Sequence, residues 1–193
     1  MENINDLPHI TTRDQLPHLL KELNLNGMGA EVGVREGEYS EMILAGSNLS
    51  ILYSIDSWTE FNQKEYKDIA NVSQKLQDYR YLKTIIRLMK FRNRSVCLRM
   101  KSEEAVKLFK DNSLDFIYLD ANHSYKNCKL DITIWWPKLK KGGLFAGHDY
   151  LNGNLPAGIF GVKKAVDEFV GREKLKLFTT KEKKYPSWYL IKS

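Results

Sequence analysis

Short, nearly continuous runs of apolar residues alternate along the chain with longer segments of helical periodicity. The apolar runs have the length of buried strands, about four to eight residues, rather than that of helices. Five of them are predicted to be strands, at 28–34, 49–56, 95–100, 114–120 and within 142–150. Two more near the C-terminus, LKLFTT and SWYLIK, are expected to form an antiparallel pair.

Between these runs, apolar residues recur every three to four positions, which predicts helices. The long polar stretch from Thr59 to Arg94 is expected to be mostly helical. Ser102 is a suitable N-cap for one helix, and Pro137 is expected to end another near Trp136. The predicted helices are a lead-in helix within residues 1–27 (TRDQLPHLLKELN), 36–46, the stretch from 59 to 94, 102–111, 124–136 and 161–170.

Strand and helix therefore alternate five times before a terminal hairpin. Parallel strands need crossover connections, and strands covered on both faces are apolar along their whole length. The pattern predicts one α/β domain over residues 1–193. We expect a doubly wound, mostly parallel seven-stranded sheet with helices on both faces and a C-terminal antiparallel hairpin. Such sheets bind ligands beyond the carboxyl ends of their strands.

Composition narrows the class of protein without naming a function. An apolar fraction of 42% over 193 residues suits one globular domain with a sizeable core. The net charge of +6 is spread over small clusters without a recognisable nucleic-acid motif, so solvated surfaces are favoured over a nucleic-acid interface. Cys97 and Cys128 lack the spacing of a metal site and are expected to be reduced thiols. No apolar run reaches the ~20 residues of a membrane helix, and the N-terminus lacks a signal-peptide pattern. We expect a cytoplasmic protein.

The stretch GAEVGVREGEYS joins the first strand to the following helix. It carries Gly33 and Gly37 but lacks the three glycines of a GxGxxG dinucleotide loop. Acids beside the helix start, Glu36 and Glu38, would repel a pyrophosphate and would suit a cofactor with a cationic amino-acid part. Alone, the pattern fits a structural turn as well as a cofactor loop.

Asp56 favours the cofactor loop. It ends the second strand, 25 residues after Glu31, where an acid can accept both hydroxyls of a ribose. Trp58 is placed to stack on an adenine, and simple packing is the alternative.

Acids and histidines also follow the fourth and fifth strands. Asp120 and His123 lie in DANHSY, and His148 and Asp149 lie in GHDY. These four side chains can converge where the two strands are neighbours. They could supply ligands for a divalent cation. Alternatively, either histidine could act as a general base or merely hydrogen-bond a nearby loop.

Five segments together resemble class I S-adenosylmethionine-dependent methyltransferases. They are EVGVREGEYS, SIDSW, DFIYLDANHSY, WWPKLKKGGLFAGHDY and GVKKAVDEF. The more specific likeness is to the small branch related to macrocin and rhamnosyl O-methyltransferases and the cephalosporin-hydroxylase group. It runs from about Gly29 to Ile191. The shared order of five segments is more specific than any one of them.

The resemblance implies S-adenosyl-L-methionine as the cofactor and assigns a role to several residues. The Gly33–Gly37 loop would hold the methionine portion and Asp120 would face the reactive centre. In metal-dependent relatives, Asp120 and two acidic residues after the fifth strand bind magnesium, and here those two are His148 and Asp149. Imidazole is a poor magnesium ligand, so Mg²⁺ or another divalent cation stays an open question. The remaining implied contacts are Glu31 and Ser40 near the amino and carboxylate groups, Asp56, Ser57 and Trp58 at the ribose, and Lys101 and Ser102 at the adenine.

The expected activity is O-methylation of a sugar or another small hydroxylated acceptor. A neutral hydroxyl is a weak nucleophile, so His148 or His123 is expected to take its proton, with Asp120 and Asp149 orienting the base or holding a metal. Residues 151–160 are a candidate acceptor loop. The lead-in helix and residues 59–79 could line the acceptor site or mediate contacts in a homo-oligomer. The rival functions are a nucleic-acid methyltransferase and a non-catalytic nucleotide-binding relative.

Overall fold

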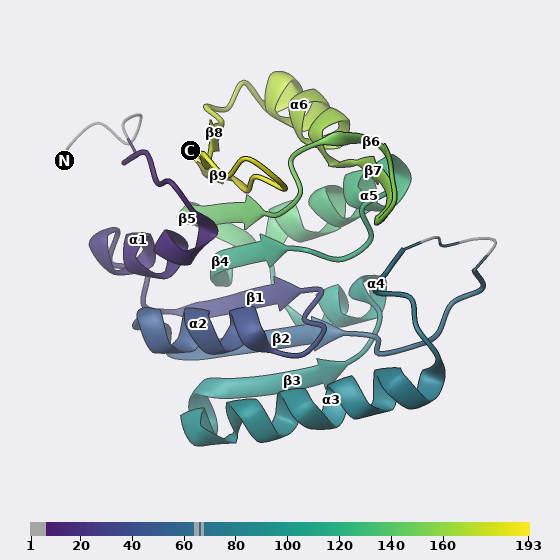
Figure 1. Ribbon diagram of the computed structural model, residues 1–193. Helices are drawn as coiled ribbons and strands as arrows, with labels where there is room; N and C mark the ends of the chain where they lie inside the picture. The colour runs from purple at the N-terminus through teal and green to yellow at the C-terminus, as the bar shows by residue number, and fades with distance from the viewer. Residues whose placement is uncertain (1–6, 64–65, 67) are drawn as a thin grey trace.

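A seven-stranded sheet forms the central layer of the computed structural model, which describes residues 7–63, 66 and 68–193 (Figure 1). The strand order is β3-β2-β1-β4-β5-β9-β8. Neighbouring strands among the first five are parallel, and β9 is antiparallel to both β5 and β8. The predicted sheet and terminal pair are confirmed. The strands are β1 (Met28–Val32), β2 (Ile51–Asp56), β3 (Ser95–Arg99), β4 (Leu114–Leu119), β5 (Leu139–Gly147), β8 (Phe178–Thr179) and β9 (Trp188–Ile191).

Helices cover both faces of this sheet, so the strands are buried on both sides. Along β4, Phe116 and Tyr118 pack into one core cluster while Ile117 and Leu119 pack into the other. This explains why the strand is apolar at nearly every position. The first cluster also contains residues of α1 (Leu16–Glu22), α2 (Glu38–Gly46) and α3 (Gln74–Leu88). The second contains residues of α4 (Ser102–Ala105), α5 (Tyr125–Trp135) and α6 (Val162–Glu173).

The stretch from Thr59 to Arg94 is less helical than expected. Helix α3 begins only at Gln74, and the described residues before it form a loop. Residues 64, 65 and 67 lie outside the described part of the chain. The Asn71 side chain organises the loop, because its amide donates to the Phe61 and Tyr66 carbonyls and its oxygen accepts from the Phe61 amide. Such side-chain bonds offer the backbone an alternative to a helix.

The helix after β3 is also shorter than predicted. Helix α4 spans one turn, and a 3₁₀ turn, Val106–Leu108, follows it. Ser102 is the first helical residue rather than the N-cap, which is Lys101. The Ser102 hydroxyl donates to Asp131 on α5.

The candidate acceptor loop 151–160 is a β-hairpin. Strands β6 (Asn152–Leu155) and β7 (Gly158–Gly161) form a separate two-stranded antiparallel sheet. The hairpin meets the loop that follows β2, since the Ile69 amide donates to the Ala157 carbonyl at 3.1 Å and Asp68 bridges to Gly158. The two segments lie on the side to which the arrows of the parallel strands point (Figure 1).

The predicted lead-in helix is present as a 3₁₀ turn, Arg13–Gln15, followed by α1. Residues 1–6 lie outside the described part of the chain. Among the described helices, none has the length and apolar character required to cross a membrane.

Candidate active site

A cleft of about 680 Å³ opens where the carboxyl ends of β1, β2, β4 and β5 meet. Its volume falls in the range of small-molecule sites, about 300–1,000 Å³. It lies at the switch point of the sheet, where β1 has β2 on one side and β4 on the other. Ten of the predicted site residues line it: Glu31, Gly33, Asp56, Ser57, Lys101, Ser102, Asp120, His123, His148 and Asp149.

Gly33 lets the loop after β1 approach the end of β4. Its φ is +91°, and a Cβ there would lie 2.0 Å from the Asp120 carbonyl oxygen. Gly37 has a different role. It is the left-handed N-cap of α2, where a Cβ would lie 2.9 Å from Thr84 on α3. Gly37 thus shapes the turn behind the cleft rather than its wall.

Glu31 presents a buried carboxyl group at the base of the cleft. Burial raises the pKa of Glu31 to about 8, although a hydrogen bond from the Ser40 hydroxyl lowers it. Ser40 is itself fully buried and also accepts a hydrogen bond from Ser54 at 3.0 Å. Ser40 therefore supports Glu31 instead of facing the cleft. A buried carboxyl of this kind ionises when a cation is brought next to it.

Asp56 fastens the loop after β1 to the end of β2. Its carboxylate accepts from the amides of Val34 at 2.9 Å, Arg35 at 3.0 Å and Trp58 at 2.9 Å. The prediction that Trp58 stacks on an adenine is wrong for this geometry. The indole is buried against Tyr81, with ring centroids 4.9 Å apart, and donates to the Arg35 carbonyl at 2.8 Å.

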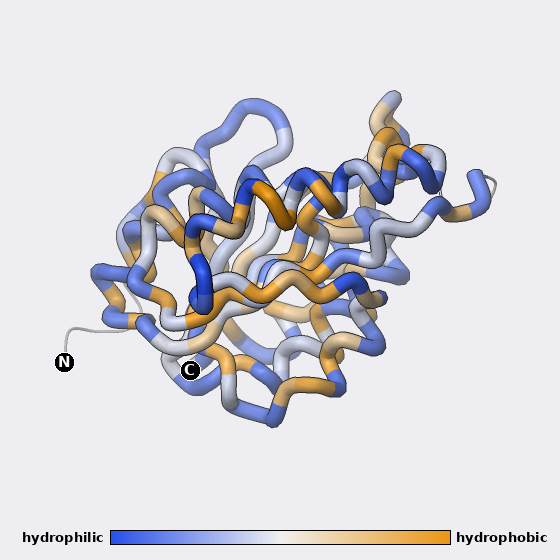
Figure 2. The backbone as a smooth tube through the Cα atoms, turned by 90° about the horizontal axis from the view of Figure 1, so that it is seen from below, coloured by the Kyte–Doolittle hydropathy of each residue, from blue (hydrophilic) through white to orange (hydrophobic). Residues whose placement is uncertain are grey.

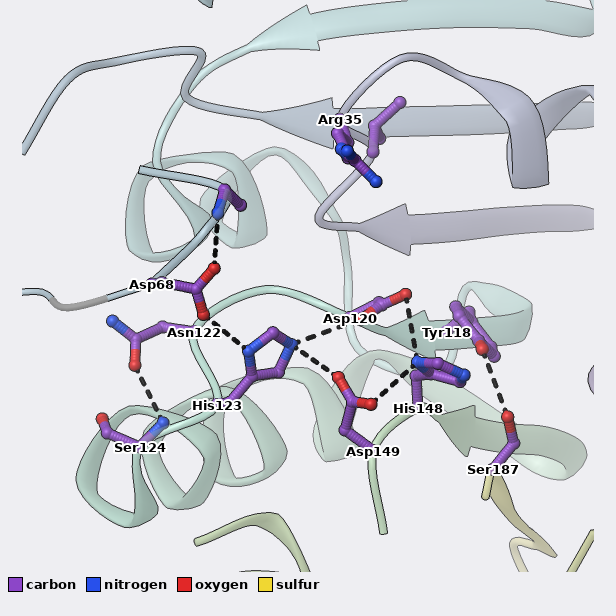
Figure 3. Close-up of polar contacts among 12 residues, drawn as sticks. Arg35, Asp68, Tyr118, Asp120, Asn122, His123, Ser124, His148, Asp149 and Ser187 are labelled. Carbon is purple, nitrogen blue, oxygen red and sulfur yellow. Dashed lines mark hydrogen bonds and ion pairs between the residues drawn. The ribbon is translucent and has the colours of Figure 1, made fainter. Parts of the chain in front are cut away.

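His123 lies among three carboxylates (Figure 3). Its Nδ1 is 2.9 Å from Asp68, and its Nε2 is 2.9 Å from Asp149 and 3.5 Å from Asp120. Burial alone would lower the pKa of His123, but the hydrogen bonds to these carboxylates raise it to about 12. Both ring nitrogens are therefore engaged, and the ring is protonated at neutral pH. Its face stacks on Phe160 of the hairpin, with centroids 4.9 Å apart.

His148 makes a narrower set of contacts. Its Nδ1 lies 3.2 Å from Asp149 and 3.9 Å from Asp120. These contacts with described residues use Nδ1, and His148 lines the cleft. Burial opposes the charge on Asp149, yet hydrogen bonds from His123 and His148 hold the pKa of Asp149 below its ordinary value. Asp149 is therefore ionised and orients both rings.

Three residues of the site were missed from the sequence. Arg13, on the lead-in turn, places Nη1 3.3 Å from Asp120 and its guanidinium over the Tyr39 ring. Asp68 lies in the stretch expected to be helical. Asp131, on α5, is buried at the cleft beside Ser102, and burial raises its pKa to about 7. None of these residues follows a strand, so the strand-end rule does not find them.

The cleft is acidic although the chain is basic. Nine acidic side chains line it, against four arginine and lysine side chains and the two histidines His123 and His148. The excess positive charge of the protein therefore lies mainly elsewhere on its surface. The acids are Glu31, Glu36, Glu38, Asp56, Asp68, Glu103, Asp120, Asp131 and Asp149, and the arginines and lysine are Arg13, Arg35, Arg80 and Lys101.

A family model described as a methyltransferase domain matches residues 30–150, which include the strand ends around the cleft. The chain belongs to this family, and its fold is that of class I methyltransferases. By sequence, no curated protein matches it.

Solved structures share the fold at low sequence identity. One is an O-methyltransferase from Bacillus cereus in complex with SAH, with 13% identity, a TM-score of 0.67, and coverage of 96% of this chain and 84% of that one. Another is the O-methyltransferase TomG from Streptomyces achromogenes in complex with SAM. It has 14% identity and a TM-score of 0.62, and the match covers 97% of this chain and 83% of that one. A third is precorrin 8w decarboxylase from Methanobacterium thermoautotrophicum. It has 15% identity and a TM-score of 0.57, and the match covers 98% of this chain and 95% of that one. These likenesses establish the fold and leave the acceptor open.

Proposed function

We propose that the protein transfers a methyl group from S-adenosyl-L-methionine to a hydroxyl group of a small acceptor, with a sugar as the favoured class. The family match and the acidic cleft at the switch point support this function. The observation that carries it is the pairing of Gly33, which brings backbone close to the cleft, with the buried acid Glu31 beside it.

The residues present fit this cofactor. Glu31 is an acid that gains from a cationic ligand group, and the cofactor carries an amino group and a sulfonium. Asp56 retains lone pairs for hydroxyl donors beyond its three amide bonds. When bound, the cofactor supplies an electrophilic methyl group. The chain's own residues must align the acceptor with it and remove the hydroxyl proton.

His148 is the proposed base. Its Nδ1–H donates to Asp149, which fixes the tautomer and leaves Nε2 to accept the hydroxyl proton. The oxygen–methyl bond forms as the sulfur–methyl bond breaks, and the proton passes from His148 to solvent. His123 is unsuited to this role because both of its nitrogens already face carboxylates. It instead supplies positive charge between Asp120 and Asp149.

A divalent cation bound between Asp120 and Asp149 is the alternative to a protonated His123 as the positive charge at this place. Asp120, His123 and Asp149 each offer a ligand atom, and these atoms lie within 4.8 Å of one another. Asp68 would accept from Nδ1 and direct Nε2 to the ion. This set uses His123 where the sequence suggested His148, and an imidazole favours transition metals over magnesium. Because the ion would displace the Nε2 proton, the two arrangements exclude each other.

The lining favours a small hydroxylated acceptor over nucleic acid. Aromatic rings of Phe61, Tyr66 and Phe160 line the cleft beside its carboxylates, so apolar ring faces and hydroxyl groups both find partners. The excess of acids would repel a phosphate backbone. The loop after β2 and the β6–β7 hairpin supply these aromatic residues, which supports a role for both segments in acceptor binding.

The test is methyl transfer from labelled cofactor to a panel of free sugars, nucleotide sugars and oligonucleotides. We expect product with a sugar-containing acceptor, at least a hundredfold loss with His148→Ala, and unchanged turnover with the exposed control His18→Ala. S-adenosylhomocysteine binding to His148→Ala should persist. Product only with oligonucleotides would overturn the acceptor class, and full turnover by His148→Ala would overturn the base.

A further inference from the structure

The outer face of α3 carries a row of large apolar side chains. The inner face is packed, with Gln77, Arg80, Thr84 and Leu88 buried. On the outer side, Leu76, Tyr79, Leu82 and Ile86 of α3 and its C-cap residue Met89 are between 40% and 71% exposed. Figure 2, seen from the side on which α3 lies, shows hydrophobic positions recurring along this helix.

The spacing of this row matches a helix-pairing seam. The steps from Tyr79 to Leu82, Ile86 and Met89 are three, four and three residues, the alternation of the a and d positions of a heptad. Side chains with this spacing form a straight stripe that a second helix can cover. We call these four residues the α3 seam.

Three cations beside the α3 seam are already paired within the chain. Lys83 lies 2.5 Å from Glu36, Arg87 lies 2.6 Å from Glu41, and Lys90 also pairs with Glu41. Lys83, Arg87 and Lys90 are therefore neutralised within the chain and do not form the cationic fringe that attracts an anionic lipid surface. A second copy of the same face can approach it without net repulsion.

We propose that the α3 seam is a homodimer interface in which the α3 helices of two copies pack antiparallel across a two-fold axis. With the axis crossing the outer face of α3 midway between Leu82 and Ile86, Leu82 meets Ile86 of the partner subunit, and Tyr79 meets Met89 of the partner subunit. Each contact occurs twice, as a two-fold interface requires.

The area available suits a dimer of moderate affinity. The seam and Leu76 expose roughly 500–600 Å² per copy, which gives about 1,100 Å² across a dimer, near the lower limit of stable interfaces. The expected dissociation constant is on the order of micromolar. The buried face of the same helix holds the loop over the cleft, since Arg80 and Gln77 donate to the Ala70 carbonyl.

Sedimentation velocity of the full chain from about 0.5 to 100 μM tests the interface. The monomer mass is 22.5 kDa, and we expect a reversible shift toward twice that mass as concentration rises. Leu82→Glu and Ile86→Lys should each weaken the dimer at least tenfold. The combined variant should regain it, because this register brings the two new charges opposite each other in both copies. Leu108→Glu, at an equally exposed leucine on another face, is the control.

Circular dichroism confirms that each variant is folded. A wild-type protein that stays monomeric at 100 μM would overturn the proposal, as would a dimer unaffected by the seam variants. Failure of the combined variant to regain the dimer would overturn the antiparallel register. Co-sedimentation of the wild type with phosphatidylserine vesicles, lost in Leu82→Glu, would assign the face to lipid instead. None of these outcomes depends on methyl transfer.

Discussion

Replacing Glu31 by glutamine removes the buried carboxyl group at the base of the cleft while keeping its size. In the ligand-free protein, burial raises the pKa of Glu31 from 4.5 to about 8. The cofactor's cationic amino group binds best to the ionised form. Cofactor binding must therefore release a proton from Glu31 wherever the pH lies below 8.

The size of the effect follows from that pKa. Only the ionised fraction is competent to bind, so the apparent affinity for S-adenosylhomocysteine should rise about 50-fold between pH 6 and pH 8. At pH 7, about 0.9 proton should be released for each ligand bound. The glutamine variant has no such proton, so its affinity should be flat over this range. Ser40→Ala removes a hydrogen bond that lowers the pKa, so it should move the midpoint to higher pH.

Isothermal titration calorimetry with S-adenosylhomocysteine at pH 6, 7 and 8 makes the measurement. Buffers with different ionisation enthalpies report the number of protons released. Equal pH dependence and equal proton release in the wild type and Glu31→Gln would refute the reasoning, because the linked proton would then belong to another group.

Three further predictions concern the loop, the buried acids and the histidine cluster. Gly33→Ala should lower the free energy of unfolding in urea by at least about 2 kcal/mol more than Gly142→Ala does. Both glycines have a positive φ, but of the two only Gly33 has backbone atoms within 4 Å of the position that a Cβ would take. Equal losses in the two variants would contradict the close approach of the Gly33 loop to the end of β4. Burial raises the pKa values of Glu31 and Asp131 to about 8 and about 7 in the folded protein. In the unfolded chain both groups ionise near pH 4, so the free energy of unfolding should be highest below about pH 4 and should fall as the pH rises from 5 to 8. Urea titration of Asp131→Asn should show a shallower fall, and an identical slope would argue against this source. Nitrogen NMR should find His123 protonated at pH 9, and loss of that signal on adding Mn²⁺ or Zn²⁺, with a rise in melting temperature, would favour the metal arrangement.

The sheet could be predicted because burial on both faces leaves a direct pattern in the sequence. Phe116, Ile117, Tyr118 and Leu119 are apolar in succession, and each packs into a core cluster. The strand-end acids Asp56 and Asp120 could be found for the same reason, since a polar residue that closes an apolar run lies at the edge of the sheet.

The loop after β2 could not be predicted from periodicity. Ile69 and Leu76 are spaced as on a helix, but Ile69 is exposed and its amide bonds the β6–β7 hairpin. Arg13 and Asp68 reach the site from segments with no chemical pattern, and only the folded chain brings them together. The sugar acceptor, the cytoplasmic location and the single domain over residues 1–193 stay predictions.

The structure of a complex with S-adenosylhomocysteine tests the central claim most directly. We predict that the ligand occupies the cleft against the Gly33 backbone, with its amino group hydrogen-bonded to Glu31 and its ribose hydroxyls to Asp56. His148 Nε2 should face the open space beside the ligand sulfur. A ligand bound outside this cleft, or with its amino group directed away from Glu31, would contradict the proposed site.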